Sequence, residues 1–162
     1  MKITYTHDLD PNEFQPLLEV DDITDTHIDN IRVLRDWFLT TGGREGIEFN
    51  MAVFTYPRPS DFLKIDHFTH CQTVGCAAGH APFAGIEKLS TETWNDYVER
   101  VFSQSVYNWL FSAAWAYFDN TIEGFVARAS ILLDHGLPLT STFLHPDRDF
   151  IQTKPYTCKR LD

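Results

Sequence analysis

The fold is decided most clearly by the stretch NTIEGFVARASILLDHGLP, which occupies positions 120–138. Its apolar side chains recur at the spacing of one face of an α-helix, at Ile122, Phe125, Val126, Ala129, Leu132 and Leu133. Asn120 is of a type that caps a helix start, and Glu123 follows where a capping carboxylate is expected. Gly136 and then Pro138 are typical of the residues that follow a helix end. We therefore predict an amphipathic helix over 120–136.

Outward from this helix, apolar periodicity and capping residues predict further helices. Their expected bounds are about 24–41, from near Thr73 to just before Pro82, about 91–103 with Ser90 as N-cap, and about 106–117. Residues 45–56 mix β-branched and aromatic side chains without helical periodicity. The predicted fold is thus mainly α, a single compact domain of about five helices with a short extended or β element near residues 45–56.

The whole chain, 1–162, has the length and composition of one domain, being 162 residues long and 43% apolar. We divide it into an acidic N-terminal segment, 1–23, a helical core, 24–138, and a loop-rich tail, 139–162. No apolar run approaches the roughly 20 residues of a membrane helix, and the first residues lack the apolar region of a signal peptide. We therefore expect a cytoplasmic protein that does not bind membranes.

Negative charge is the main property of the predicted surface. The formal net charge is −10, which argues against binding to nucleic-acid phosphates. Within the first thirty positions, several carboxylates are accompanied by only one basic side chain. We expect this acidic region, with Asp21, Asp22 and Asp25, to form a binding surface together with exposed aromatic side chains. Charge reversal at these three positions is expected to weaken partner binding without lowering thermal stability.

Residues 67–83 contain the strongest local signal for chemistry, with three of the seven histidines and two of the three cysteines. Zinc takes four nitrogen or sulfur ligands in a tetrahedron. Cys76 and His80 are four positions apart and would share one face of a helix. Cys71, with His67 or His70, would complete a metal site from the preceding loop. We expect no bound cofactor, and zinc is the one alternative that the sequence suggests.

Two other interpretations of these residues stay open. Cys76 is a small apolar residue suited to a helix interface, with Thr73 as the helix N-cap. Alternatively, Cys76 is a nucleophile whose proton passes to His80 or to another nearby histidine. The phosphate-binding glycine loops, the zinc-protease motif and the serine-hydrolase elbow do not occur in the chain.

Several motifs together resemble a group of short, uncharacterised phage and bacterial proteins. They are the Phe-Asn-Met sequence at 49–51, the segment CQTVGCAAGHA at 71–81, the Trp-Leu-Phe sequence at 109–111 and the final helix over 120–138. The pattern of the group runs Phe-x-Met, then Cys-Gly-Thr-x-x-Cys-x-x-Gly-(His or Trp)-Ala, then Trp-Leu-Phe and an amphipathic helix. The resemblance covers most of residues 49–138.

The chain departs from that pattern at Gln72, where the group has glycine. The position of His80 accepts tryptophan in the group, so the resemblance implies that Cys71 and Cys76 are the stronger ligand candidates. The group supplies no established activity.

These observations lead to one expected function and two alternatives. We expect a non-enzymatic phage accessory protein in the host cytosol, which binds and inhibits or sequesters a host defence protein or a small molecule. One alternative is a metal- or thiol-dependent enzyme centred on Cys71, Cys76 and the nearby histidines. The other is a zinc-stabilised binding module. Association of the chain with itself is a further expectation.

Overall fold

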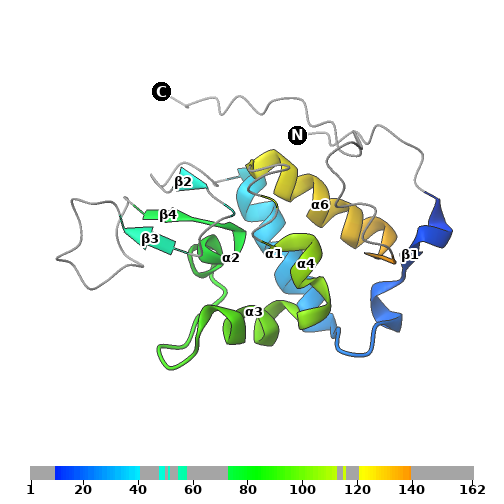
Figure 1. The fold of residues 1–162 in the computed structure, drawn as a ribbon, viewed down its shortest axis with the longest axis horizontal. Helices are drawn as coiled ribbons and strands as arrows, with labels where there is room; N and C mark the ends of the chain where they lie inside the picture. Colours follow the sequence, from blue (N-terminus) through cyan, green and yellow to red (C-terminus); the bar gives the residue numbers. More distant parts are fainter. Residues whose placement is uncertain are drawn as a thin grey trace.

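The computed structural model describes residues 10–40, 48–49, 51, 55–57, 73–112, 115 and 121–139. Within these residues the chain is mainly helical, which confirms the predicted fold class (Figure 1). The helices are α1 (Asp25–Thr40), α2 (Ala77–His80), α3 (Trp94–Phe102), α4 (Tyr107–Leu110) and α6 (Ile122–His135). Short 3-10 helices cover Pro11–Glu13, Leu17–Glu19, Ala81–Ala84 and Gln104–Val106.

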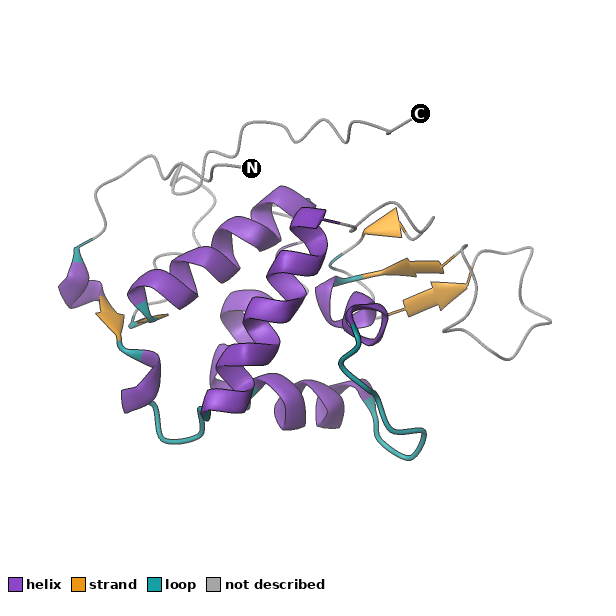
Figure 2. Cartoon of the chain, turned by 180° about the vertical axis from the view of Figure 1, so that it is seen from behind, coloured by secondary structure: helices purple, strands orange, loops and turns teal. Residues whose placement is uncertain are grey.

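Two small sheets lie at opposite ends of the helical part, as both ribbon views show (Figures 1 and 2). The strands are β1 (Phe14–Gln15), β2 (Glu48–Phe49), β3 (Thr55–Pro57), β4 (Thr73–Gly75) and β5 (Leu137–Pro138). One sheet has the order β2-β4-β3, with β2 parallel and β3 antiparallel to β4. The other pairs β1 with β5 in antiparallel register. β2 and β3 confirm the extended element predicted within 45–56, of which the other residues, except Met51, lie outside the described part.

Aromatic side chains connect the helices through the core. The ring of Phe38 on α1 lies 5.2 Å from that of Phe125 on α6, and Phe111 lies 6.1 Å from Phe125 and 4.8 Å from Phe102 on α3. All four rings are almost completely buried. Burying a side chain of this size contributes about 1.5–3 kcal/mol relative to leaving it exposed. These four rings therefore join α1, α3 and α6, with Phe111 after α4 lying between α3 and α6.

Three predicted helix starts were wrong. Thr73 belongs to strand β4, so the helix begins only after Cys76, which occupies the N-cap position. Local sequence could not reveal this, because β4 is held by pairing with β2 and β3 from elsewhere in the chain. α2 does end before Pro82, as predicted, and Pro82 lies in the following 3-10 helix.

The other two errors concern the choice between neighbouring capping residues. α3 is capped by Thr93 rather than Ser90, because Thr93 and Asp96 form a reciprocal capping box. α6 is capped by Thr121 rather than Asn120, since the Thr121 hydroxyl accepts a hydrogen bond from the Gly124 amide at 3.0 Å. The predicted end of α6 is confirmed at His135, where Gly136 adopts a φ of 107°.

The helices predicted over about 24–41 and 106–117 differ in outcome. The first is confirmed as α1, with Ile31, Leu34 and Phe38 buried. The second is represented by α4 and the preceding 3-10 helix, and residues 113–114 and 116–117 lie outside the described part of the chain.

Candidate functional site

Cys76 lies in the core at the start of α2. It is 2% exposed, and burial raises the pKa of its thiol to about 11, although the backbone amides of Gly79 and Ala78 partly offset this. The pKa of the neighbouring Tyr107 hydroxyl is raised too, mainly by burial. Negative charge on a Cys76 thiolate would act in the same direction. Since the thiolate is the reactive form, a thiol with this pKa is a poor nucleophile at neutral pH. The geometry favours the packing interpretation of Cys76 over the nucleophilic one.

His80, four residues further on, is fully buried among aromatic rings. Its ring centroid lies 5.2 Å from that of Phe38, 5.6 Å from that of Trp37 and 5.8 Å from that of Phe49. The rings come from α1 and β2, so His80 joins the helical core to the three-stranded sheet. The imidazole is thus in contact with the core on several sides rather than displayed on a surface.

The remaining predicted zinc ligands, His67, His70 and Cys71, lie outside the described residues. Among the residues that are described, no three His, Cys, Asp or Glu side chains are grouped as a metal ion requires. Cys76 and His80 are joined through the backbone, where the His80 amide donates to the Cys76 carbonyl at 3.1 Å. Zinc binding by the full set stays a prediction.

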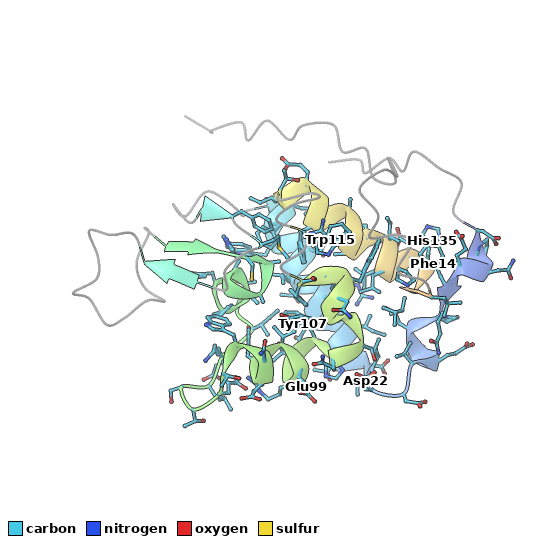
Figure 3. The ribbon with its side chains drawn as sticks, in the orientation of Figure 1. Phe14, Asp22, Glu99, Tyr107, Trp115 and His135 are labelled. Carbon is cyan, nitrogen blue, oxygen red and sulfur yellow. The ribbon has the colours of Figure 1, made fainter. Side chains whose placement is uncertain are left out.

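The three carboxylates of the predicted binding surface differ in their contacts. Asp21, Asp22 and Asp25 are all exposed. Asp21 and Asp25 have no hydrogen-bond or ion-pair partner among the described residues. Asp22 instead lies against the C-terminal end of α3, where its carboxylate accepts from the Ser103 hydroxyl at 2.6 Å and from the Ser105 amide at 3.2 Å (Figure 3). The Ser105 hydroxyl donates to it as well.

These contacts change the expected role of Asp22. Partial burial raises the pKa of its carboxyl, but the hydrogen bonds from Ser103 and Ser105 outweigh burial and hold the pKa below its usual value of 3.8. The side chain therefore stabilises the fold. The expectation that reversing its charge leaves thermal stability unchanged does not fit this geometry.

The first turns of α1 are hydrogen-bonded to the end of α3 as well. His27 donates from Nε2 to the Arg100 carbonyl at 3.0 Å, and Asn30 donates to the Val101 carbonyl at 2.8 Å. Both carbonyls belong to the last turn of α3, where backbone acceptors lack helical partners. Sequence reasoning missed these contacts, because they join residues about seventy positions apart.

An exposed leucine lies within the acidic segment. Leu18, in the 3-10 helix Leu17–Glu19, is 72% exposed, more than any other large apolar side chain described. Glu19 and Asp21, which follow it closely, are exposed too. We call Leu18, Glu19, Asp21 and Asp25 the acidic surface from here on.

A second charged cluster, which the sequence analysis missed, orders the loop before α3. Glu92 accepts from the Arg100 guanidinium at 2.6 and 2.9 Å and from the Leu89 amide at 2.7 Å. The hydrogen bonds from Arg100 are the main reason that the pKa of Glu92 falls to about 2. The Lys88 ammonium lies 5.1 Å from the centroid of the Trp94 ring. This cluster fixes the loop conformation.

Arg128 is a buried charged residue that apolar periodicity did not identify. It is fully buried on α6, and its guanidinium carbon lies 3.9 Å from the centroid of the Trp115 ring. Figure 3 labels Trp115. Its carbonyl accepts from the Trp109 indole at 2.9 Å. Because α6 is buried on nearly all sides from Gly124 to Leu132, a position on its polar face still lies in the interior.

Comparisons of the chain with known protein families, with curated proteins and with solved structures found no match. Among the described residues, no helix combines the length and the apolar character that crossing a bilayer requires.

Proposed function

We propose that the protein is a non-enzymatic phage accessory protein that binds a host protein through the acidic surface and so inhibits or sequesters it. The observation that carries the proposal is the exposure of Leu18 in a segment whose carboxylates at Glu19, Asp21 and Asp25 are exposed too and have no side-chain partner among the described residues. The phage origin rests on the resemblance of the sequence motifs alone.

The composition of the acidic surface favours a basic partner. Binding surfaces commonly combine an apolar anchor, which supplies affinity, with a polar rim. Leu18 has the character of such an anchor, and Glu19, Asp21 and Asp25 have that of an acidic rim. Complementary charge on the partner would speed association and make it sensitive to salt. We therefore propose a partner surface with an apolar pocket bordered by lysine or arginine side chains.

The state of the reactive side chains supports a binding role over catalysis. Cys76 is buried and its thiol has a raised pKa. Ser103 is 1% exposed, and its hydroxyl donates to Asp22 rather than to a histidine. Both side chains contribute to packing, and neither meets the requirement of a nucleophile that substrate can reach.

The experiment compares capture of bacterial host proteins by the immobilised full-length chain and by two double variants. Asp21→Lys with Asp25→Lys changes the acidic surface and leaves Asp22 intact. Glu87→Lys with Asp134→Lys is the matched control, because it makes the same change in net charge at exposed positions elsewhere. We expect a partner that the wild type and the control retain and that the first double variant loses.

A third variant, Leu18→Ser, tests the apolar anchor and is expected to weaken capture of the same partner. Since Leu18 is 72% exposed, this change is expected to leave the folding stability nearly unaltered. Equal capture by all variants, at low and high salt, would remove the acidic surface as the binding site.

A further inference from the structure

The first turn of α1 is closed by a capping box that contains a histidine. Thr24 precedes the helix, and its hydroxyl accepts from the His27 backbone amide at 3.3 Å. In return, Nδ1 of the His27 ring accepts from the Thr24 backbone amide at 3.2 Å. The Thr24 carbonyl also accepts the helical hydrogen bond from Ile28 at 3.1 Å. In most capping boxes, glutamate or glutamine supplies the acceptor that His27 provides here.

The hydrogen bonds fix the protonation state of the His27 ring. A backbone amide can only donate, so Nδ1 must carry a lone pair towards Thr24. A backbone carbonyl can only accept, so Nε2 must carry the proton that is donated to Arg100 at 3.0 Å. Both requirements are met only by the neutral ring protonated at Nε2.

We propose that Thr24 and His27 form a pH-sensitive capping box, which is closed when the imidazole is neutral and opens when Nδ1 gains a proton. A protonated Nδ1 is a donor and would confront the Thr24 amide, which is also a donor. The first turn of α1 then loses one of its caps, and a positive charge lies at the positive end of the helix dipole. Histidine side chains ordinarily change charge between pH 5 and 8.

Charged residues occur on each of the elements next to the ring. Asp22 lies in the preceding segment, Asp25 at the start of α1 and Glu99 on α3. Arg100 also lies on α3, and its guanidinium is engaged by Glu92 and by the Glu87 carbonyl. In either protonation state of the ring, Nε2 can donate to the Arg100 carbonyl.

The two hydrogen bonds of the ring therefore respond differently to acid. Protonation breaks the bond from Thr24 and preserves the bond to Arg100. Opening is confined to the junction between the acidic N-terminal segment and α1, while α1 stays attached to α3. This inference concerns the chain alone and does not depend on the proposed binding partner.

NMR spectroscopy of the full-length protein tests the proposal through the Thr24 amide and the His27 ring, recorded between pH 8 and pH 5. We expect both to titrate with one midpoint. We also expect the hydrogen-exchange protection of the Thr24 amide to fall about fivefold across it, which corresponds to the loss of an ordinary cap.

The second capping box of the protein provides an internal control. Thr93 is paired with Asp96, a carboxyl whose pKa lies below 3.8 because the Thr93 hydroxyl and amide donate to it. The Thr93 amide should therefore not respond between pH 8 and pH 5. The variant His27→Gln retains a side-chain acceptor that does not titrate, so the response of the Thr24 amide should disappear.

Either of two results in the wild-type protein overturns the proposal, whether or not the variant folds. One is a Thr24 amide that stays unchanged while the His27 ring titrates. The other is a His27 ring that remains neutral down to pH 5. A Thr24 response that persists in folded His27→Gln would also overturn it.

Discussion

The carboxylate of Asp22 and the hydroxyl of Ser103 lie 2.6 Å apart, although 81 positions separate them in the sequence. Ser103 is the only non-glycine residue with positive φ among those described, at φ 83° and ψ 146°. A side chain in this backbone region costs about 1–3 kcal/mol and persists only where its surroundings hold it. Asp22 supplies part of that hold and thereby joins the acidic segment to the turn after α3.

We predict that Asp22→Ala lowers the free energy of unfolding by about 1 kcal/mol at pH 7, a value reduced for solvent exposure. Because the pKa of Asp22 is lowered in the folded protein, its contribution is present above pH 3.8 and is lost as the pH falls through the folded value. Urea unfolding at pH 7 and pH 2.5 measures this difference.

Asp21→Ala is the matched control, because Asp21 is exposed and has no partner among the described residues. Its effect should stay within about 0.5 kcal/mol at both pH values. Equal effects of the two substitutions at pH 7 would show that the Ser103 contact contributes no stability.

Sequence periodicity predicted the parts of the fold that are determined locally. Leu34 and Phe38 on α1 and Phe125 on α6 repeat at helical spacing, and all are buried. The start of α2 was wrong because Thr73 is held in a strand by distant partners, which no local pattern records. Tertiary pairing overrides local preference in such segments.

The candidate site was predictable only as a set of exposed charges. The acidic character of Asp21 and Asp25 follows directly from the sequence, and both are exposed. The structural role of Asp22 does not follow, since nothing local distinguishes it from Asp21. Its position beside Ser103 depends on how the segment before α1 crosses the end of α3.

A second prediction concerns the loop before α3, where Glu92→Gln should lower the free energy of unfolding by about 1 kcal/mol. The amide side chain retains an acceptor for Leu89 but loses the charge that pairs with Arg100. The pKa of Glu92 is lowered to about 2, so its contribution is present above pH 4.5 and is lost as the pH falls towards 2. Wild type and variant should therefore converge in acid, as measured by thermal unfolding at a series of pH values. A constant difference down to pH 2 would contradict the charge-based explanation.

Cys76 provides a test of packing against chemistry. Cys76→Ala keeps a small apolar side chain in the buried site and should cost no more than about 1 kcal/mol, whereas Cys76→Ser buries a hydroxyl and should cost about 1–3 kcal/mol. Denaturant unfolding compares the two variants. In the native wild type, the Cys76 thiol should react slowly with a thiol reagent, because it is buried and protonated at neutral pH.

The zinc content of the wild type and of Cys76→Ala distinguishes a zinc ligand from a residue that only packs in the core. One zinc ion per chain in the wild type, lost in Cys76→Ala, would contradict a purely packing role and would make Cys76 a ligand.

Alanine substitutions at two glycines with positive φ distinguish the cost of backbone strain from the cost of a steric clash. Gly85 has a φ of 88° and Gly136 a φ of 107°, so an added Cβ is unfavourable at both. At Gly85 no atom lies within 4 Å of the position of that Cβ, whereas at Gly136 it would lie 2.2 Å from the Gln15 carbonyl oxygen. Gly85→Ala should therefore cost about 1 kcal/mol, from strain alone. Gly136→Ala should cost at least about 2 kcal/mol more, because β1 must move away from β5 to relieve the overlap. Equal losses of unfolding free energy in urea would mean that β1 moves away from β5 at no energetic cost. If the hydrogen bond from the Leu139 amide to the Glu13 carbonyl is lost in Gly136→Ala alone, the destabilisation lies in the pairing of β1 with β5.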